Sequence, residues 1–485
     1  MRAAATQGYH PHLLQRPAWR SLARHRVSPA VALQPPRLHQ RTFRSTTPAR
    51  LFGLRLPEPS NEPLAGTGGD ASGPPWLFLA EVLVGLPAAL WAYKCLMLVV
   101  FQRRIIYLPS VPPGTRDESL DDGERTSARD ASLGGLAWRQ VSVRSDEPTR
   151  WLRRPVELRG VEMSWNEGAG SVTAATATAR RQKIVVVYLQ GNAGTPLLRI
   201  PLFRSLLRDT TPTTSSTTSL PTRPHVTLLA VAPRTFWRSI RSTPTERSVL
   251  ADYTAALAHA YAEHGPSARY ILYGHSLGGA AAVLLLRQLG QAPFTSSVGA
   301  VDSLVAPPVP STSPQPSPVA HLPPISGLIL ENPLPSIPHM VRALYPQRWL
   351  PYHYLGPFAF DKWDALGRLE RLSPSSSTSS SVERPPRSLW IRSERDEIMP
   401  GGEDDGVRRM YAAWVRATEQ ERERAGAGSE ELGAAAGDED RSVRSRWVEV
   451  AGALHDTAYL ERRWRDEIQS FLAEVASATH DERRR

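Results

Sequence analysis

The chain contains a single cysteine, Cys95, among its 485 residues. One cysteine cannot form an intramolecular disulfide, and it cannot supply the paired thiolates of a structural zinc site. Cys95 lies within a long apolar run, where packing in a protein core or in lipid is its expected role. The composition therefore excludes a disulfide framework and, in practice, a zinc–thiolate centre, and we expect neither a metal nor a cofactor.

The first 57 residues lack both lysine and acidic residues, and the first carboxylate is Glu58. The arginines of this leader account for nearly all of the net charge of +11. The rest of the chain is near neutral and has no general attraction to a phosphate backbone, so we expect no nucleic-acid partner. An Arg-rich, acid-free leader with Ser, Thr and Ala is typical of a mitochondrial transit peptide. A basic, disordered tail is the alternative for residues 1–74.

One apolar run is long enough to cross a bilayer. As a helix, residues 75–101 (PWLFLAEVLVGLPAALWAYKCLMLVVF) would rise about 40 Å, and a hydrocarbon core is about 30 Å thick. Glu81 lies near one end, Pro87 is expected to kink the helix, and Lys94 is close enough to the other end to snorkel. We predict a single-pass membrane protein, with a mitochondrial location favoured over the endoplasmic reticulum. The alternative is an apolar helix docked on the following domain.

Beyond this run, strand and helix patterns alternate. Continuous apolar, β-branched segments at 183–189 and 226–232 are typical of strands buried on both faces. Further strands are predicted at 137–143, 155–165, 269–274, 326–332, 388–393 and 446–452, and helices at 247–264, 277–289, 405–420 and 458–474. The strands at 137–143 and 155–165 are expected to be antiparallel. The alternation predicts an α/β fold with a doubly wound, mostly parallel sheet and helices on both faces, in one domain over 102–485.

Four low-complexity segments interrupt this pattern. They are rich in Ser, Thr and Pro or in charge, and they cover 208–224, 291–325, 372–387 and 421–443. Such compositions do not pack a core. All four fall between predicted elements, where a surface loop tolerates added length at little cost.

The segment Gly274-His275-Ser276-Leu277-Gly278 stands between a predicted strand and a predicted helix. A G-x-S-x-G sequence in this context forms a nucleophile elbow, in which the serine has a strained backbone and its Oγ is exposed at the helix N-terminus. The two glycines remove Cβ atoms that would collide with the neighbouring strand and helix. We therefore predict that Ser276 is a nucleophile. Epoxide hydrolysis on the same fold would require an aspartate there.

A serine hydroxyl needs a base to take its proton, and the base needs a partner that holds its tautomer. In this fold the partners follow the serine in the order acid, then histidine. His455 follows the last predicted strand and is the predicted base. Asp396 follows the preceding strand and is the predicted orienting carboxylate, with Glu394 and Glu397 as competitors. Asp456, beside the histidine, is expected to cap the following helix.

The oxyanion of a tetrahedral intermediate needs two backbone N–H donors. One is predicted to come from Leu277, directly after the nucleophile. The other is predicted to come from the glycine-containing loop Gln190–Gly194, where we favour Asn192 and keep Gly191 as the alternative. No Walker lysine follows this loop, which argues against a phosphate-binding cradle.

Several further motifs occur in a characteristic order. They are LQGNAGT (189–195), STPTERSVLADY (242–253), GHSLGG (274–279), LILENPLPSIPHMV (328–341), KWDALGRLERL (362–372), DEIMP (396–400) and GALHDTAYLERRW (452–464). Together they resemble the membrane-anchored α/β-hydrolase-domain-containing proteins, a group that includes acylglycerol and lysophospholipid lipases and protein S-acyl thioesterases. FQRRIIYLP (101–109) resembles the stretch that joins the membrane helix of that family to its hydrolase domain. The resemblance covers about 98–475, insertions excepted.

The resemblance implies a membrane-anchored serine hydrolase that cleaves carboxylic ester or thioester bonds through an acyl-enzyme. Its expected partners are the bilayer and a membrane lipid or acylated substrate. The apolar segment 333–363 is predicted to form a lid over the acyl pocket, with an ordinary cap core as the alternative. Two departures, Gln190 in place of the usual histidine and a glycine-free turn at 233–237, favour an alternative function. This is a catalytically weak or inactive, membrane-tethered binding protein that keeps the fold.

Overall fold

The computed structural model describes residues 50–51, 54–55, 75–120, 133–147, 155–165, 181–208, 224–291, 293–294, 322–372, 385–399, 401–402, 405–427 and 444–478. The chain divides into two compact units, Met1–Gly73 and Pro74–Arg485. In the first, β1 (Arg50–Leu51) and β2 (Leu54–Arg55) pair antiparallel. Most of the predicted leader and the interiors of the four predicted insertions lie outside the described residues.

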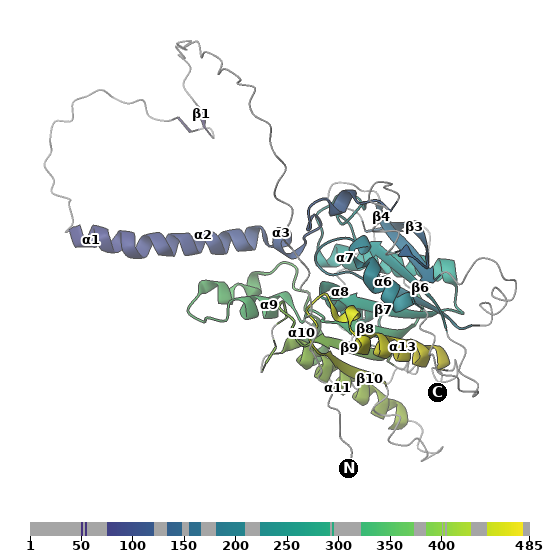
Figure 1. The fold of residues 1–485 in the computed structure, drawn as a ribbon. Helices are drawn as coiled ribbons and strands as arrows, with labels where there is room; N and C mark the ends of the chain where they lie inside the picture. Colours follow the sequence, from purple (N-terminus) through teal and green to yellow (C-terminus); the bar gives the residue numbers. More distant parts are fainter. Residues whose placement is uncertain are drawn as a thin grey trace, which may run out of the picture. The chain divides into compact units, whose positions relative to one another are not determined.

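The second unit begins with a continuous helix made of α1 (Pro75–Ala80), the π-helical turn η1 (Glu81–Gly85) and α2 (Leu86–Val100) (Figure 1). Within it, Phe78–Val100 is long and apolar enough to cross a membrane, with a mean hydropathy of 1.8, and no part of its most apolar stretch is buried. The π turn ends two residues before Pro87, whose ring would clash with the carbonyl of residue 83 in a regular α-helix. A short helix, α3 (Gln102–Ile106), follows.

Eight strands of the second unit form one sheet. They are β3 (Leu136–Ser145), β4 (Val156–Trp165), β5 (Lys183–Leu189), β6 (His225–Ala232), β7 (Arg269–His275), β8 (Ile325–Glu331), β9 (Arg387–Ser393) and β10 (Ser445–Val450). Their order is β10-β9-β8-β7-β5-β6-β4-β3. β4 is antiparallel to both its neighbours and all other pairs are parallel. This is the mixed, mostly parallel sheet of the α/β-hydrolase fold, and the prediction of the fold class is confirmed.

Helices cover both faces of the sheet. On one face α6 (Ile200–Leu207) contacts α13 (Arg462–Ser477), and these two helices pack on strands from both halves of the sheet (Figure 1). On the other face α8 (Leu277–Gln288) packs on β5, β7 and β8 and contacts α7 (Glu246–His264) and α10 (Ala365–Glu370). α11 (Gly406–Ala427) packs against α10. A sheet enclosed in this way has its central strands buried on both sides.

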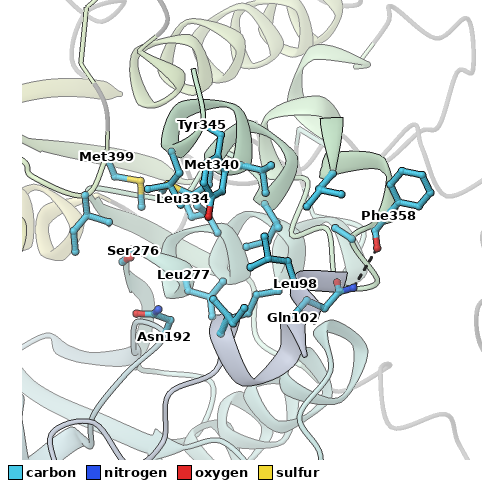
Figure 2. Close-up of a pocket in the computed structure, with 18 of the residues that line it drawn as sticks. Leu98, Gln102, Asn192, Ser276, Leu277, Leu334, Met340, Tyr345, Phe358 and Met399 are labelled. Carbon is cyan, nitrogen blue, oxygen red and sulfur yellow. Dashed lines mark hydrogen bonds between the residues drawn. The ribbon is translucent and has the colours of Figure 1, made fainter. Parts of the chain in front are cut away.

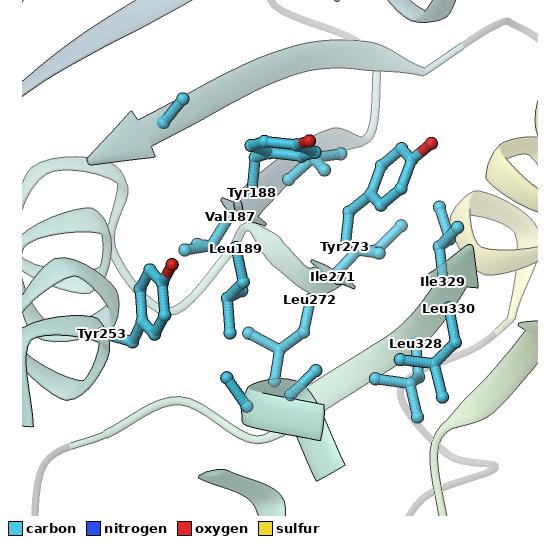
Figure 3. Close-up of a cluster of buried hydrophobic side chains, with 14 of the residues drawn as sticks. Val187, Tyr188, Leu189, Tyr253, Ile271, Leu272, Tyr273, Leu328, Ile329 and Leu330 are labelled. Atoms are coloured by element: carbon cyan, nitrogen blue, oxygen red, sulfur yellow. The ribbon is translucent and has the colours of Figure 1, made fainter. Parts of the chain in front are cut away.

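The core is centred on β5, β7 and β8, whose adjacent apolar side chains are shown in Figure 3. Residues 184–189 of β5 are essentially inaccessible to solvent along their whole length. Burial on both faces explains why these strands are continuous apolar runs with no polar alternation. Burying each such aliphatic side chain stabilises the fold by about 1.5–3 kcal/mol.

The structure departs from the predicted elements in three respects. Its described residues include helices that were not predicted, among them α6, α9 (Ile337–Leu344) and α10. The helix predicted at 405–420 continues to Ala427, so the predicted insertion at 421–443 begins too early.

The third difference lies near the C-terminus. The last helix begins at Arg462, because the 3₁₀ turn η8 (Ala458–Leu460) precedes it. The last strand ends at Val450 rather than at residue 452, because Gly452 has a φ of 72° and turns the chain. A left-handed φ of this kind is open to glycine at little steric cost. The shorter strand leaves a longer loop, and this loop carries His455.

The predicted lid, residues 333–363, contains α9 (Ile337–Leu344) and two 3₁₀ turns, η6 (Pro351–Tyr354) and η7 (Gly356–Phe358). Ser336 caps α9, since its Oγ accepts a hydrogen bond from the backbone N–H of His339 at 3.1 Å. Leu334 and Tyr352 are buried, whereas Trp349, Tyr354 and other apolar side chains are exposed. The segment is therefore not an ordinary core, because part of its apolar surface faces outward.

Candidate active site

Ser276 joins β7 to α8 in a sharp turn, with φ 54° and ψ −119°. Its backbone N–H donates to Glu331 O at 3.0 Å, and its carbonyl accepts from Leu334 N at 3.0 Å, so the end of β8 holds the strained turn in place. A Cβ on Gly278 would lie 1.9 Å from Leu189 O, and one on Gly274 would lie 2.4 Å from Gly278 O. Both glycines are thus required by close backbone approach.

The strand order places this turn at the switch point of the sheet. β5 lies between β6 and β7, so the chain leaves β5 toward one side for β6 and later returns on the other side as β7. Loops that diverge in this way open a crevice at the carboxyl ends of the strands, where ligands bind in open α/β sheets. Asn192 follows β5 and Ser276 follows β7. Together with Leu277 they border a cavity of about 400 Å³ (Figure 2).

His455 and Asp396 are brought together by the loops after β10 and β9. The imidazole Nδ1 lies 2.9 Å from both carboxylate oxygens of Asp396. Asp396 Oδ1 also accepts from the backbone N–H groups of Ile398 (2.9 Å) and Met399 (2.8 Å), and Oδ2 accepts from Arg392 Nη1 (2.7 Å). Burial by itself raises the pKa of Asp396, but the hydrogen bond and charge of His455 and the two backbone donors outweigh it. The pKa is therefore below its ordinary value, and the carboxylate is ionised at neutral pH.

The two competing carboxylates occupy different places. Glu397 Oε2 accepts from the backbone N–H of His455 at 3.0 Å, and Glu394 Oε2 accepts from that of Gly452 at 2.7 Å. Both therefore hold the backbone of the histidine loop. Of the three carboxylates, the structure brings Asp396 to the imidazole ring.

Asn332 is a residue that the sequence analysis missed. It directly follows β8 with a φ of 44°, and its Nδ2 donates to His455 O at 3.0 Å. Its Oδ1 accepts from the backbone N–H of Ser393 at 2.8 Å, so one side chain ties the ends of two strands to the histidine loop. An asparagine at the end of a buried strand, where a left-handed backbone is tolerated, was the available signal.

A second missed residue is Arg199, which lies just before α6. Its Nη2 donates to Asp456 Oδ1 at 2.5 Å and lies 3.3 Å from His275 Nδ1. The expectation that Asp456 caps the following helix is therefore wrong, because its carboxylate faces this arginine. Burial, followed by the charge of Arg199, holds the pKa of His275 well below its ordinary value. His275 is thus neutral, and its Nε2 lies 3.1 Å from His455 O.

Within the described residues, His275, His455 and Asp456 place possible metal-ligand atoms within 4.8 Å of one another. The guanidinium of Arg199 already contacts two of these three residues, and its positive charge opposes a bound cation. His455 Nδ1 is also engaged by Asp396. The donor set therefore suits proton transfer better than metal binding.

The residues of the two predicted oxyanion donors, Leu277 and Asn192, border the same cavity as Ser276. Leu277 is the first residue of α8, and the first N–H groups of a helix have no acceptor within it. The loop that carries Asn192 is fixed by the segment that follows α3. Asn192 O accepts a hydrogen bond from the backbone N–H of Leu108 at 2.8 Å, and Leu108 forms a parallel bridge with Ala193. Gly191 leaves room beside Ser276, since a Cβ there would lie 3.5 Å from the serine Cβ.

No family model matches the chain, and no curated protein matches its sequence. Among solved structures, an α/β hydrolase from Vibrio vulnificus is 14% identical over 76% of this chain and 92% of its own, with a TM-score of 0.41. An esterase from Pyrococcus furiosus is 13% identical over 72% and 94%, with a TM-score of 0.39. Carboxyl esterase 2 from the fungus Tuber melanosporum is 12% identical over 72% and 87%, with a TM-score of 0.36. These scores are low, so the chain's own strand order carries its assignment to the fold. The narrower resemblance to membrane-anchored hydrolases stays a prediction.

The first departure from the resembled family, Gln190, is buried directly after β5. Within the described residues, both atoms of its side-chain amide lack a hydrogen-bond partner. A buried amide left unsatisfied costs about 1–3 kcal/mol. The loop is supported instead through its backbone, because Gln190 O accepts from Tyr253 Oη at 3.5 Å and Leu108 holds Asn192.

The second departure is the turn at 233–237, which has no glycine. Thr235 (φ 77°) and Trp237 (φ 44°) both adopt left-handed backbones that glycine would adopt more easily. Side chains compensate, because Arg234 forms a buried ion pair with Asp252 at 2.7 Å and Trp237 Nε1 donates to Glu118 O at 2.8 Å. The turn is therefore built without glycine but at the cost of local backbone strain.

Proposed function

We propose that this chain is a membrane-anchored serine hydrolase that cleaves carboxylic ester or thioester bonds of lipid-like acyl substrates. One observation carries the proposal: the buried Asp396–His455 pair lies at the same edge of the sheet as the elbow serine Ser276. An elbow serine, a histidine and an ionised aspartate in this chain order form the constellation used for acyl transfer in this fold.

In the proposed reaction Ser276 Oγ attacks the substrate carbonyl carbon while His455 Nε2 takes its proton. Asp396 stabilises the imidazolium, and the N–H groups of Leu277 and Asn192 bind the oxyanion. Collapse breaks the C–O or C–S bond, and His455 passes its proton to the leaving alcohol or thiol. Water then attacks the acyl-enzyme, loses its proton to His455, and the acid is released as Ser276 recovers its proton.

Among the described residues, the Ser276 hydroxyl and the His455 ring do not form a hydrogen bond. Catalytic hydrogen bonds are often long before substrate binds and tighten in the complex. The cavity indicates the class of substrate. Its volume of about 400 Å³ lies in the range of small-molecule sites, ~300–1,000 Å³. Its walls are mainly apolar side chains of the lid, such as Ile337, Met340 and Leu355. Such a space suits an acyl chain better than a charged ligand.

A fluorophosphonate probe tests the proposal, because it reacts only with an activated serine. The full-length protein is expected to be labelled, and Ser276→Ala is expected to remain unlabelled. Mass spectrometry of the labelled peptide identifies the modified residue. Failure of the folded wild-type protein to react would contradict the proposed chemistry.

A binding protein that keeps the fold is the second candidate, and the unsatisfied buried amide of Gln190 favours it. Gln190→His restores the residue usual in the resembled family. If the wild-type protein binds a long-chain fatty acid but reacts with the probe only after Gln190→His, the second candidate is correct. If the wild-type protein and Gln190→His react with the probe at similar rates, Gln190 does not weaken the site.

The proposed anchor makes a separate prediction. A variant without residues 1–74 retains the apolar helix and is expected to stay in the membrane fraction after carbonate extraction. A variant without residues 1–101 is expected to be released, because Phe78–Val100 supplies the span. Extraction of the shorter deletion into the soluble fraction would contradict a spanning helix. Residues 1–74 fused to a fluorescent protein distinguish mitochondrial import from retention in the endoplasmic reticulum.

A further inference from the structure

The end of the apolar helix forms one wall of the cavity beside Ser276. Leu98 and Val99 from α2 and Gln102, Ile105 and Ile106 from α3 border the same space as the nucleophile. Figure 2 shows Leu98 and Gln102 around this cavity together with Ser276 and with Met340 and Tyr345 of the lid. The helix is therefore part of the site and not merely a tether to it.

Polar contacts hold this wall against the lid. Gln102 is buried, its Nε2 donates to Phe358 O at 3.2 Å, and its Oε1 accepts from the backbone N–H of Phe360 at 2.6 Å. Arg103 forms an ion pair with the buried carboxylate of Asp361 at 2.9 Å. Three residues near the end of the lid, Phe358, Phe360 and Asp361, are thus bonded to α3, which sets the position of the helix end relative to the cavity.

Two further contacts show how far the lid extends along the helix. Trp349 packs on Trp91 with ring centroids 6.1 Å apart, and Lys94 Nζ lies 4.3 Å from the centroid of the Tyr352 ring. Trp91 and Lys94 stand nine and six residues before Val100, the last residue of α2. At about 1.5 Å per residue these contacts lie about 13 Å and 9 Å from the helix end. If the helix spans a bilayer, the lid lies beside it below the membrane surface.

The lid exposes large aromatic side chains, as expected for an element that lies in a membrane. Its exposed large apolar side chains outside the cavity are Trp349, Tyr354 and Phe360, and Trp349 is 70% exposed; Leu344 and Phe358 are also exposed but line the cavity. Several exposed large apolar side chains on one short segment are unusual on a surface that faces water. Trp and Tyr are favoured at the boundary between headgroups and acyl chains, where an embedded element lies about 5–10 Å deep. The lid's own cation–π contact with Lys94 also gives the one lysine of the apolar run a partner there.

We propose that residues 337–360 of the lid are embedded in the same bilayer leaflet as the end of α2, and that the cavity opens into this leaflet. A substrate then enters from the hydrocarbon, acyl chain first, with its ester or thioester bond near headgroup level at Ser276. The substrate class is a membrane-resident amphiphile with a long acyl chain. This inference rests on the proposed membrane anchor and deepens the proposed function.

The single cysteine of the chain allows a direct test of depth. In the full-length protein Cys95→Ser removes the only native thiol, and Trp349→Cys or Phe360→Cys then introduces one thiol on the outer lid. Leu460→Cys is the matched control, because Leu460 is a 57% exposed apolar residue on the hydrolase body, outside the lid and cavity. Each variant carries a nitrobenzoxadiazole label and is reconstituted into phosphatidylcholine vesicles.

Lipids with a spin label in the upper acyl chain are expected to quench the probes at 349 and 360, and aqueous iodide is expected to quench the probe at 460. Equal quenching of all three by iodide, in vesicles from which carbonate does not extract the protein, overturns the proposal while leaving the anchor intact. Fluorophosphonate reactivity of the same samples reports separately on the proposed chemistry.

A kinetic experiment tests entry from the leaflet. Trp349→Ser is expected to lower kcat/KM for a long-chain ester carried in vesicles about tenfold and to leave a short soluble ester within about twofold, because one aromatic membrane contact is lost. Leu460→Ser is expected to change neither value. Vesicles that carry a long-chain monoacylglycerol or an S-acylated peptide distinguish the two sources of acyl chain. An equal loss on short and long substrates would indicate a folding defect and contradict the proposal.

Discussion

Ser276→Ala is expected to lower kcat for hydrolysis of a short acyl ester by about 10⁶-fold, because the proposed triad acts as a unit and loses its nucleophile. The change removes one oxygen and keeps the Cβ, so the strained turn and its bonds to Glu331 and Leu334 stay in place. Backbone groups at Leu277 and Asn192 are retained, so a small residual rate above that in water is expected. The melting temperature is expected to be unchanged.

The measurement is steady-state hydrolysis of a soluble short-chain ester by matched preparations. Ser205→Ala is the control, because Ser205 is a part-buried serine of α6 whose Oγ contacts Tyr459 O at 3.4 Å, away from the cavity. Its activity is expected to remain at the wild-type level. Full activity in Ser276→Ala would show that another group performs the attack.

Asp396→Asn is expected to lower kcat by about 10⁴-fold, through the tautomer of the histidine. The two backbone donors at Ile398 and Met399 will hold the amide oxygen at the Oδ1 position. The amide NH₂ then faces Arg392 and His455 Nδ1, where the carboxylate accepted hydrogen bonds. An NH₂ beside Nδ1 favours a proton on Nε2, and an Nε2 that carries a proton cannot accept the one from Ser276.

Glu397→Gln provides the isosteric control for the acid. Glu397 accepts from the backbone N–H of His455, and a glutamine oxygen can accept the same bond. The loss of kcat is therefore expected to stay below about tenfold, the effect of weakening one hydrogen bond to a charged acceptor. If Glu397→Gln were the more damaging change, the assignment of Asp396 as the orienting acid would be wrong. ¹H NMR of the imidazole N–H protons reports the tautomer in each variant.

The regular elements were predictable because their signals are local. The run KIVVVYL at 183–189 is β5 at the predicted bounds, and the antiparallel pair at the start of the sheet was predicted from alternation. The elbow was predictable for the same reason, since two glycines around a serine between strand and helix are all adjacent in sequence. The role of Asp456 was not predictable in this way. Its carboxylate pairs with Arg199, which is distant in sequence and lies just before α6, instead of capping the helix that follows it.

The sequence by itself determined the fold class, the eight strands of the large sheet, four of the helices, the elbow at Ser276 and the short list of candidate acids and bases, because each depends on side chains within one element or one loop. It did not reveal the short helices α6, α9 and α10. Only the tertiary structure decided which of the three carboxylates at 394, 396 and 397 faces His455, since all three lie in one loop and differ mainly in direction. It also decided that Asn332 and Arg199 hold the site and that the apolar helix is a wall of the cavity. Gln102 meets Phe358 across 256 residues, and such contacts are set by the packing of the whole sheet rather than by any local pattern.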